Sequence, residues 1–483
     1  MSSRRALPRA LRPAALALAV TLAAGCVTTE PKPEEVQAQA LEHAPIPAAW
    51  SSKTESAAPV VDGWVATFRD PQLEALVAEA LAHNPDLTVA AARVEAAEAQ
   101  VDMAQAQLKP AIGILGRAGA KPISDLVAML SGVMIRLAWE IDLWGRMRYE
   151  RNAAIAMRDA SSADYRFARQ SIAASVARAW FLAAETAMQL QLANRMAEDS
   201  KRLVDLSRDR QRVGAGNETD VFAANASYAT YRDAAQQVEL AHQQALRALE
   251  LLAGRYPAGN IAAATDLAPF PGPVPAGMPL DALNRRPDLQ AAERRAAAAF
   301  DLVGSAKASF WPTLSLAAGY GHVNRQAVDL QENLDRNTGS GSATTVIPLY
   351  TGGRLTGNVR LRTAEQRQAI GDYARLALQA LNEVEDALNA EQVLAAREAL
   401  LQEAADDSRR AAGLTETSFR VGKSDMRDVM NRNLAANAAE VALLAVRRER
   451  LARRVDLHLA LGGDFVQGTD TSSTAPASTG QQQ

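Results

Sequence analysis

Apolar residues recur along this chain with two different periods, and the period changes at fixed places. In residues 71–108 and 280–310 they return every three or four positions among Ala, Leu, Glu, Arg and Gln. This period predicts an amphipathic helix in each segment, ended by Pro110 and by Pro312.

The segments that follow these helices, residues 111–139 and 313–347, change to a period of two. Every second position is apolar, with mostly small or polar residues between, at Val133, Ile135, Leu137 and Trp139 and again at Leu314, Leu316, Ala318 and Tyr320. Alternation around a turn-rich centre predicts one β-hairpin in each segment.

After each hairpin the helical period resumes and continues without interruption. Residues 145–213 contain no proline, and about 68 helical residues at about 1.5 Å each would span about 100 Å. A second rod of this kind runs to residue 421, with one apolar face marked by Ile370, Tyr373, Leu376, Ala377, Ala380, Leu381, Val384 and Leu388.

Both rods are expected to turn back on themselves. Gly214 and Gly422 break them, and each returns as a shorter helix that ends at Gly254 or Gly462, where glycine suits a helix C-terminal cap. We therefore expect two antiparallel helix pairs in extended packing.

An internal repeat relates the two halves of the chain. The segment 84–87 (NPDL) recurs 202 residues later as 286–289 (RPDL), and 212–214 (RVG) recurs 208 residues later as 420–422. Two internal structural repeats are therefore expected, at 64–256 and 280–464, joined by a Pro-rich linker at 257–279.

The N-terminus has the pattern of an export signal. Four arginines precede the apolar stretch 14–24, which is too short to span a membrane as a stable helix. The sequence LAAGC, ending at Cys26, resembles a bacterial lipoprotein processing site. That resemblance implies a signal peptide at 1–25, acylation of Cys26 and, because Val27 follows, delivery to the outer membrane.

Low-complexity segments flank the repeats. Residues 26–63 hold Pro31, Pro33, Pro45, Pro47 and Pro59, so we expect an extended tether without helix. Residues 465–483 are mostly Ser, Thr, Gly and Gln, which predicts a disordered tail.

Composition narrows the possible chemistry. Among 483 residues there is one cysteine, and the five histidines are scattered without ligand spacing, so no disulfide framework, metal site or metal cofactor is expected. Lys plus Arg is 52 against 55 Asp plus Glu, a net charge of −3, which argues against a nucleic-acid partner. No later segment has 18 consecutive apolar residues, so no transmembrane helix is expected in the mature chain.

The four expected strands imply more than one copy of the chain. Each strand offers about 9 to 11 residues, enough to cross an outer membrane when tilted. Four strands cannot close a barrel, and open strand edges are not tolerated in lipid. Two copies would supply eight strands and three would supply twelve, and strand arithmetic alone does not choose between them.

Seven short segments, in order, carry a resemblance to a known family. They are WVATFRD (64–70), NPDL (84–87), WEIDLWGR (139–146), RRPDL (285–289), AKASFWPT (306–313), PLYTGGRL (348–355) and LALGG (459–463). Together they resemble the outer-membrane factor family, the TolC-like efflux channels, in their lipoprotein branch.

This resemblance implies a fold and a function. The fold is a trimeric membrane β-barrel of 12 strands, continuous with an all-α periplasmic tunnel of 12 helices. The function is the passive exit duct of a tripartite efflux pump, with a periplasmic adaptor and an inner-membrane transporter, of RND type, as partners and no enzymatic activity. The cofactor expectation is none beyond the lipid on Cys26.

Aromatic residues mark the expected junctions between strands and helices. They are Trp139, Trp144, Trp311 and Tyr350. Amphipathic aromatics favour a lipid headgroup boundary, and an alternative role is to fill the joint between helix and sheet.

The tips of the rods are the expected aperture and docking surface. By the resemblance, Asp428 occupies an acidic aperture position, with Asp425 before it, Asp220 as the first-half counterpart and Arg427 as a possible ion-pair partner. The family's neighbouring acidic position is Asn431 here. Arg212, Gly214, Arg420 and Gly422 are expected at the tip turns, where the adaptor would dock. An alternative role for the aspartates is helix capping.

Three other functions remain open from sequence. A type I secretion duct would share the fold, and a lipid-anchored helical scaffold or adhesin would have no pore. An enzyme would have to use carboxylate clusters such as Glu140 with Asp142, or Glu383 with Glu385 and Asp386, whose helix and joint contexts favour structural roles.

Overall fold

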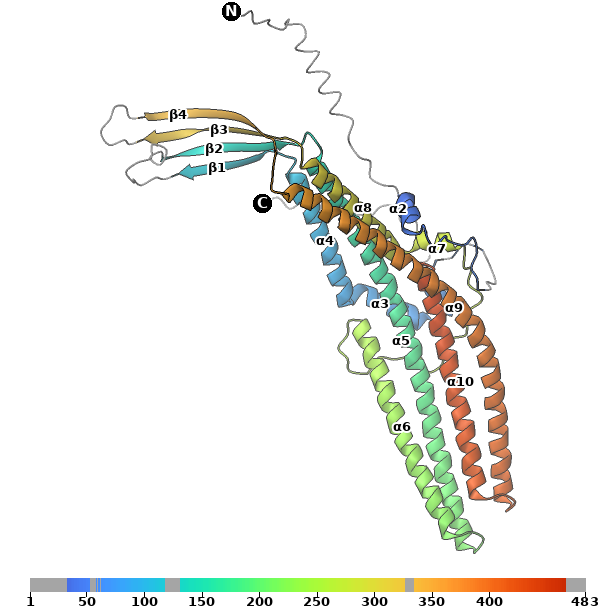
Figure 1. The fold of residues 1–483 in the computed structure, drawn as a ribbon. Helices are drawn as coiled ribbons and strands as arrows, with labels where there is room; N and C mark the ends of the chain where they lie inside the picture. Colours follow the sequence, from blue (N-terminus) through green and yellow to red (C-terminus); the bar gives the residue numbers. More distant parts are fainter. Residues whose placement is uncertain are drawn as a thin grey trace, which may run out of the picture. The chain divides into compact units, whose positions relative to one another are not determined.

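The computed structural model describes residues 33–52, 58, 60, 62–117, 131–325 and 334–465. The expected signal peptide at 1–25, Cys26, the first hairpin loop and the tail from 466 onward lie outside the described residues. In chain order the elements are α2 (Pro33–Ala40), the 3-10 helix η1 (Trp64–Phe68), α3 (Pro71–His83), α4 (Pro85–Ala106), β1 (Ala111–Arg117), β2 (Ser131–Ile141), α5 (Arg146–Arg212), α6 (Glu218–Leu252), α7 (Pro279–Arg285), α8 (Pro287–Ala308), β3 (Thr313–Arg325), β4 (Leu334–Val346), α9 (Arg354–Arg420) and α10 (Met426–Ala460) (Figure 1).

The chain divides into two compact units. One comprises Met1–Ala44, Ala92–Ala163 and Gln290–Arg375, and it contains the β-sheet. The other comprises Pro45–Ala91, Asp164–Leu289 and Leu376–Gln483, and it contains α6 and α10. The long helices α5 and α9 contribute residues to both units.

The two expected hairpins form one antiparallel sheet of four strands in the order β1-β2-β3-β4. Ala111 pairs with Ala138, Ile141 with Leu314, and Thr313 with Val346. Relative to the sequence prediction, β2 continues to Ile141, whereas β4 ends at Val346.

The two faces of the sheet differ in polarity. Pairing and strand alternation give one face the residues Ile112, Ile114, Val133, Ile135, Leu137, Trp139, Ile141, Leu314, Leu316, Ala318 and Tyr320. The opposite face carries Arg136, Glu140, Ser315, Thr338, Ser340, Ser342 and Thr344. No sheet residue with a described side chain is buried.

The prediction of single helices over 71–108 and 280–310 was wrong. Each is split, into α3 and α4 at Asn84 and into α7 and α8 at Arg286. Both residues precede a proline, which disfavours helical backbone, and they have ψ of 126° and 120°. The proline that follows then begins the next helix.

The extended tether also needs correction, because α2 lies within it. Pro33 is its first residue, where a proline costs no helical hydrogen bond, and Glu34 and Glu35 follow in the first turn. The expectation that every proline here would prevent a helix overlooked this position.

The two long rods are confirmed. α5 and α9 are each 67 residues long, and the returning helices α6 and α10 are each 35 residues long. Gly214 and Gly422 turn the chain with φ of 76° and 80°. No described helix is both long and apolar enough to cross a membrane.

The repeat has a physical basis at the ends of α6 and α10. The Asn84 side chain donates to the Leu252 carbonyl at 2.9 Å, and Arg286 donates to the equivalent Ala460 carbonyl at 3.4 Å. A Cβ on Gly254 would lie 2.9 Å from the His83 carbonyl carbon and would also meet its oxygen. On Gly462 it would lie 3.0 Å from the Arg285 carbonyl carbon. Both halves therefore use glycine to let a helix end contact the chain before the NPDL or RPDL segment.

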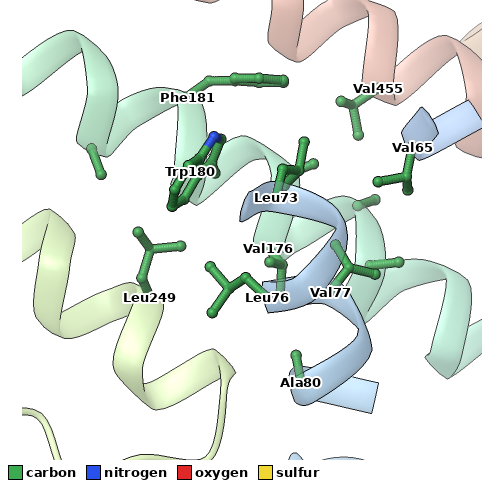
Figure 2. Close-up of a cluster of buried hydrophobic side chains, with 14 of the residues drawn as sticks. Val65, Leu73, Leu76, Val77, Ala80, Val176, Trp180, Phe181, Leu249 and Val455 are labelled. Atoms are coloured by element: carbon green, nitrogen blue, oxygen red, sulfur yellow. The ribbon is translucent and has the colours of Figure 1, made fainter. Parts of the chain in front are cut away.

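The largest apolar core belongs to the second unit and surrounds α3. Figure 2 shows Leu73, Leu76 and Val77 of α3 near Trp180 and Leu249, which come from α5 and α6. Asp70 accepts two backbone N–H groups at the start of α3 and also the Trp180 indole N–H at 2.7 Å. This dual contact explains the WVATFRD segment, since η1 buries Trp64 and Phe68 while Asp70 begins the next helix.

His458 is a buried titratable group of this region. It is 5% exposed and stacks on Trp64 with ring centroids 5.7 Å apart. Burial, together with the nearby Arg454 charge, lowers the pKa of His458 from 6.5 to about 3. The imidazole is therefore neutral in the folded protein.

We expect replacing Gly254 by Ala to destabilise the fold more than replacing Gly214. Both glycines have positive φ, 74° and 76°, so each substitution carries a backbone strain of about 1 to 3 kcal/mol. Only Gly254 also has its Cβ position blocked, because nothing lies within 4 Å of that position at Gly214. Thermal unfolding of both variants in detergent measures the difference, and equal midpoints would contradict the close contact.

We expect His458 to make the protein acid-sensitive. Below about pH 6.5 the unfolded chain takes up a proton at this residue, whereas the folded chain does so only near pH 3. Stability due to the neutral imidazole is thus lost as pH falls from about 6.5 towards 3. The midpoint of thermal unfolding should fall less between pH 7 and pH 4.5 in His458→Phe than in the parent. The exposed His43→Phe control should behave like the parent.

Candidate functional site

The tip of the second rod presents two exposed carboxylates in a fixed arrangement. Asp425 is the N-cap of α10 and accepts the backbone N–H of Asp428 at 2.8 Å. Ser424 donates to the Asp428 carboxylate at 3.3 Å. The helix end therefore holds both side chains in place, and both remain exposed to solvent.

The first rod tip has the same capping geometry. Asn217 is the N-cap of α6 and accepts the backbone N–H of Asp220 at 2.8 Å. Asn217 is the repeat equivalent of Asp425, so an amide replaces a carboxylate at the same position. The capping alternative is thus present in the structure, through Asn217 and Asp425.

The basic residues expected at the tips bind acids on their own helices. Arg212 contacts Asp209 and Arg420 contacts Glu416, each at 2.6 Å and on exposed surface. Such pairs contribute about 0 to 1 kcal/mol. Arg427 is exposed. Within the described residues, no ion pair joins it to Asp425 or Asp428.

Sequence analysis missed Arg210, which joins the two tips. Its guanidinium donates to the Phe419 carbonyl at 2.7 Å and to the Ala215 carbonyl at 3.3 Å, and it lies 4.5 Å from the centre of the Phe419 ring. Beneath it lies a small apolar cluster formed by Leu203, Val204, Ala224, Phe419, Met426 and Val429. The repeat equivalent of Arg210 is Ser418, so comparison of the two halves did not single out Arg210.

A second missed feature is a row of arginines on α10. Arg447 and Arg450 both donate to Glu398 of α9, at 3.2 and 2.9 Å. Arg448 donates to Glu185 of α5 at 2.9 Å. The signal was present in the sequence RRERLARR (447–454), whose arginines recur with helical spacing.

The same row of arginines contacts the Pro-rich linker (257–279). Arg454 is 2% exposed, bonds to Glu391 and donates to the Gly272 carbonyl. Phe270 lies under two guanidinium groups, 3.6 Å from that of Arg450 and 4.4 Å from that of Arg454. Because the charges are paired and stacked, burying Arg454 is compatible with a stable core.

The carboxylate clusters that an enzyme would need are bound to arginines and to backbone N–H groups. Glu140 pairs with Arg146 at 2.9 Å, and Asp142 accepts backbone N–H groups at the start of α5. Glu383 pairs with buried Arg286 at 2.6 Å, and Glu385 accepts two backbone N–H groups from 51–52. Within the described residues, no three His, Cys, Asp or Glu side chains are arranged to hold a metal ion.

The aromatic residues expected at the strand-helix junctions are found there. Trp144 stacks on Trp311 with ring centroids 5.0 Å apart and donates to the Pro312 carbonyl at 2.8 Å. Trp139 donates to the Leu108 carbonyl at 3.0 Å. These contacts fit the joint-filling role, while Trp311 and Tyr350 remain 54% and 89% exposed.

Comparison with known proteins identifies the fold. The family model described as outer membrane efflux protein matches residues 76–255 and 278–463. Among solved structures, the outer-membrane channel OprN superposes with a TM-score of 0.77 at 25% identity, covering 87% of this chain and 98% of that one. VceC from Vibrio cholerae gives 0.76 at 25% identity, covering 84% and 100%.

Curated relatives agree with this assignment. The chain is 28% identical over 447 residues to the probable efflux pump outer membrane protein TtgC of Pseudomonas putida, covering 88% of this chain and 91% of the relative. It is equally similar, with the same coverage, to the outer membrane protein OprJ of Pseudomonas aeruginosa. The channel fold, outer-membrane location and efflux function implied by the resemblance are confirmed. The chain belongs to the outer membrane efflux protein family and is an outer-membrane channel of efflux pumps.

Proposed function

We propose that three copies of this chain assemble into a passive, lipid-anchored exit duct. Their twelve strands would close a barrel in the outer membrane, and their twelve long helices would enclose a periplasmic tunnel. The observation that carries this proposal is the sheet, which has an apolar face that its own chain leaves uncovered and two outer strands, β1 and β4. Only closure with other strands satisfies such edges in hydrocarbon.

Two further components would complete the pump. A periplasmic adaptor would dock on the rod tips around Arg212, Gly214, Arg420 and Gly422, and an inner-membrane transporter of RND type would supply energy. Relatives are named as toluene, antibiotic and pyoverdine exporters. We therefore favour toxic or exported small molecules as substrates over the polypeptides of a type I secretion duct.

The second rod tip would form the aperture. Around a threefold axis, Asp425 and Asp428 would each become a ring of three carboxylates, and Asp220 would add a third ring. In the first tip, where Asn217 takes the place of the capping carboxylate, Glu218 lies beside Asp220. Rings of carboxylates favour cations.

Two regions would place the chain in the membrane. The exposed Trp311 and Tyr350, together with Trp139 and Trp144, would lie at the headgroup boundary while the tryptophan contacts hold the joint. The acyl groups on Cys26 would anchor the N-terminus in the same membrane.

We expect the parent protein to conduct ions in planar bilayers with a preference for cations, and the double variant Asp425→Asn with Asp428→Asn to weaken that preference. Asn preserves the cap at 425, as Asn217 does in the first tip, so the helix should remain intact. Ion selectivity is measured from reversal potentials in a salt gradient.

Asp407→Asn is the control for this experiment, because Asp407 is an exposed acid of α9 away from the tip. It should leave selectivity unchanged. Unaltered selectivity in the double variant would reject the aperture assignment.

We expect Cys26→Ala to abolish incorporation of an alkyne-tagged palmitate into the protein. The reason is that Cys26 is the only thiol in the chain. The tag is detected by fluorescence after gel separation, with the Val27→Ala variant as a control that should still incorporate it. Absence of the tag from the parent would exclude the lipid anchor.

A further inference from the structure

The internal repeat extends to the pairing of the strands. Under the offsets of 202 and 208 residues, β1 corresponds to β3 and β2 corresponds to β4. Ala111 pairs with Ala138, and their equivalents Thr313 and Val346 pair with each other. The two hairpins therefore share one register, and equivalence between their strands is exact to the residue along the described ladders.

The contact between β2 and β3 has no equivalent inside the chain. By the repeat, the equivalent contact would join β4 to a β1 strand. Because β1 and β4 are the two outer strands of the sheet, that β1 would have to come from another copy. Ile141 pairs with Leu314. Their equivalents are Leu349 in β4's continuation and Ile112 in β1. Trp139 pairs with Leu316, and their equivalents are Ile347 and Ile114.

We infer that β4 of one copy pairs antiparallel with β1 of the next copy in the register that sets Ile347 opposite Ile114 and Leu349 opposite Ile112. The inference rests on the proposed assembly of several copies, and it specifies how neighbouring copies are joined. It names a single register among those that the open edges would allow.

The end of β4 supports this register. Residues 347–349 correspond to 139–141, which form the last part of β2 where it pairs with β3 alone. In the chain by itself residues 347–349 are not strand, and Ile347 and Leu349 are 59% and 93% exposed. Pairing with the next copy would extend β4 through these three residues, as pairing with β3 extends β2, except that Pro348 has no N–H to donate where the equivalent Glu140 has one.

The polarity of the two faces supports it independently. Ile347 and Leu349 fall on the same face as Ile112 and Ile114, which are 72% and 76% exposed in the single chain. A shift by one residue would set Ile347 and Leu349 opposite residues of β1 that lie on the polar face of the next copy.

Two apolar residues on the polar face give a sharper indication. Of the large apolar side chains of the sheet that are exposed, Leu115 and Val346 lie on the polar face. The inferred register sets Val346 of one copy directly opposite Leu115 of the next. Directly opposed apolar pairs stabilise a sheet by about 0.2 to 1 kcal/mol, so the pairing accounts for both exceptions.

Disulfide cross-linking tests the register. The pair Ile347→Cys with Ile114→Cys should link neighbouring copies on mild oxidation, because opposed strand residues have the Cα separation that a disulfide requires. Pairs offset by two residues, Ile347→Cys with Ile112→Cys and Ile347→Cys with Gly116→Cys, are matched controls. We expect the aligned pair to give on the order of tenfold more linked product, since diagonal neighbours are about 7 to 8 Å apart.

Each outcome separates the register from the assembly. Linked dimers and trimers are read from non-reducing gels, and the parent and each single variant report any linkage through Cys26. Each variant is first checked for the mobility of an unheated trimer. Stronger linkage by an offset pair, or no linkage by any pair in assembled protein, would overturn the register alone. A parent that purifies as single copies would overturn the proposed assembly as well.

Discussion

Hydrogen-bond satisfaction at the edges of the four-stranded sheet is the constraint on which this protein depends. The strands β2, β3 and β4 are 11 to 13 residues long, which is enough to cross a bilayer, but β1 and β4 expose backbone groups that hydrocarbon cannot satisfy. A soluble sheet of this size would cover one face with helices, whereas here every described sheet side chain stays at least partly exposed. In the proposed assembly the chain is therefore a segment of a larger wall.

Internal duplication builds both halves of the chain with the same contacts. The same glycine contact ends α6 and α10, and the same strand register joins both hairpins. The halves differ at the rod tips: the second tip has a carboxylate at Asp425 where the first has Asn217, and Arg210 has Ser418 as its equivalent.

Much of the fold could be predicted from periodicity, because long helices and exposed hairpins repeat their patterns over many residues. The breaks at Asn84 and Arg286 were missed because helical periodicity continues on both sides of them, so the proline after each one was given too little weight. At α2 the error was the reverse, since the prolines were taken to exclude a helix although Pro33 begins it. Of the candidate site, the repeat located the tip aspartates and glycines. Arg210 and the arginine row of α10 were not found, since their partners Phe419, Glu185, Glu391 and Glu398 are distant in sequence.

The uncovered apolar face of the sheet has a consequence for the life of the chain before it reaches its final place. A newly exported copy must travel through water with this surface and two strand edges exposed, which is the condition under which β-proteins aggregate. Its most hazardous period is thus the interval between secretion and insertion. Escort by a holding chaperone, or rapid capture at the target bilayer, would shield this surface or shorten its exposure.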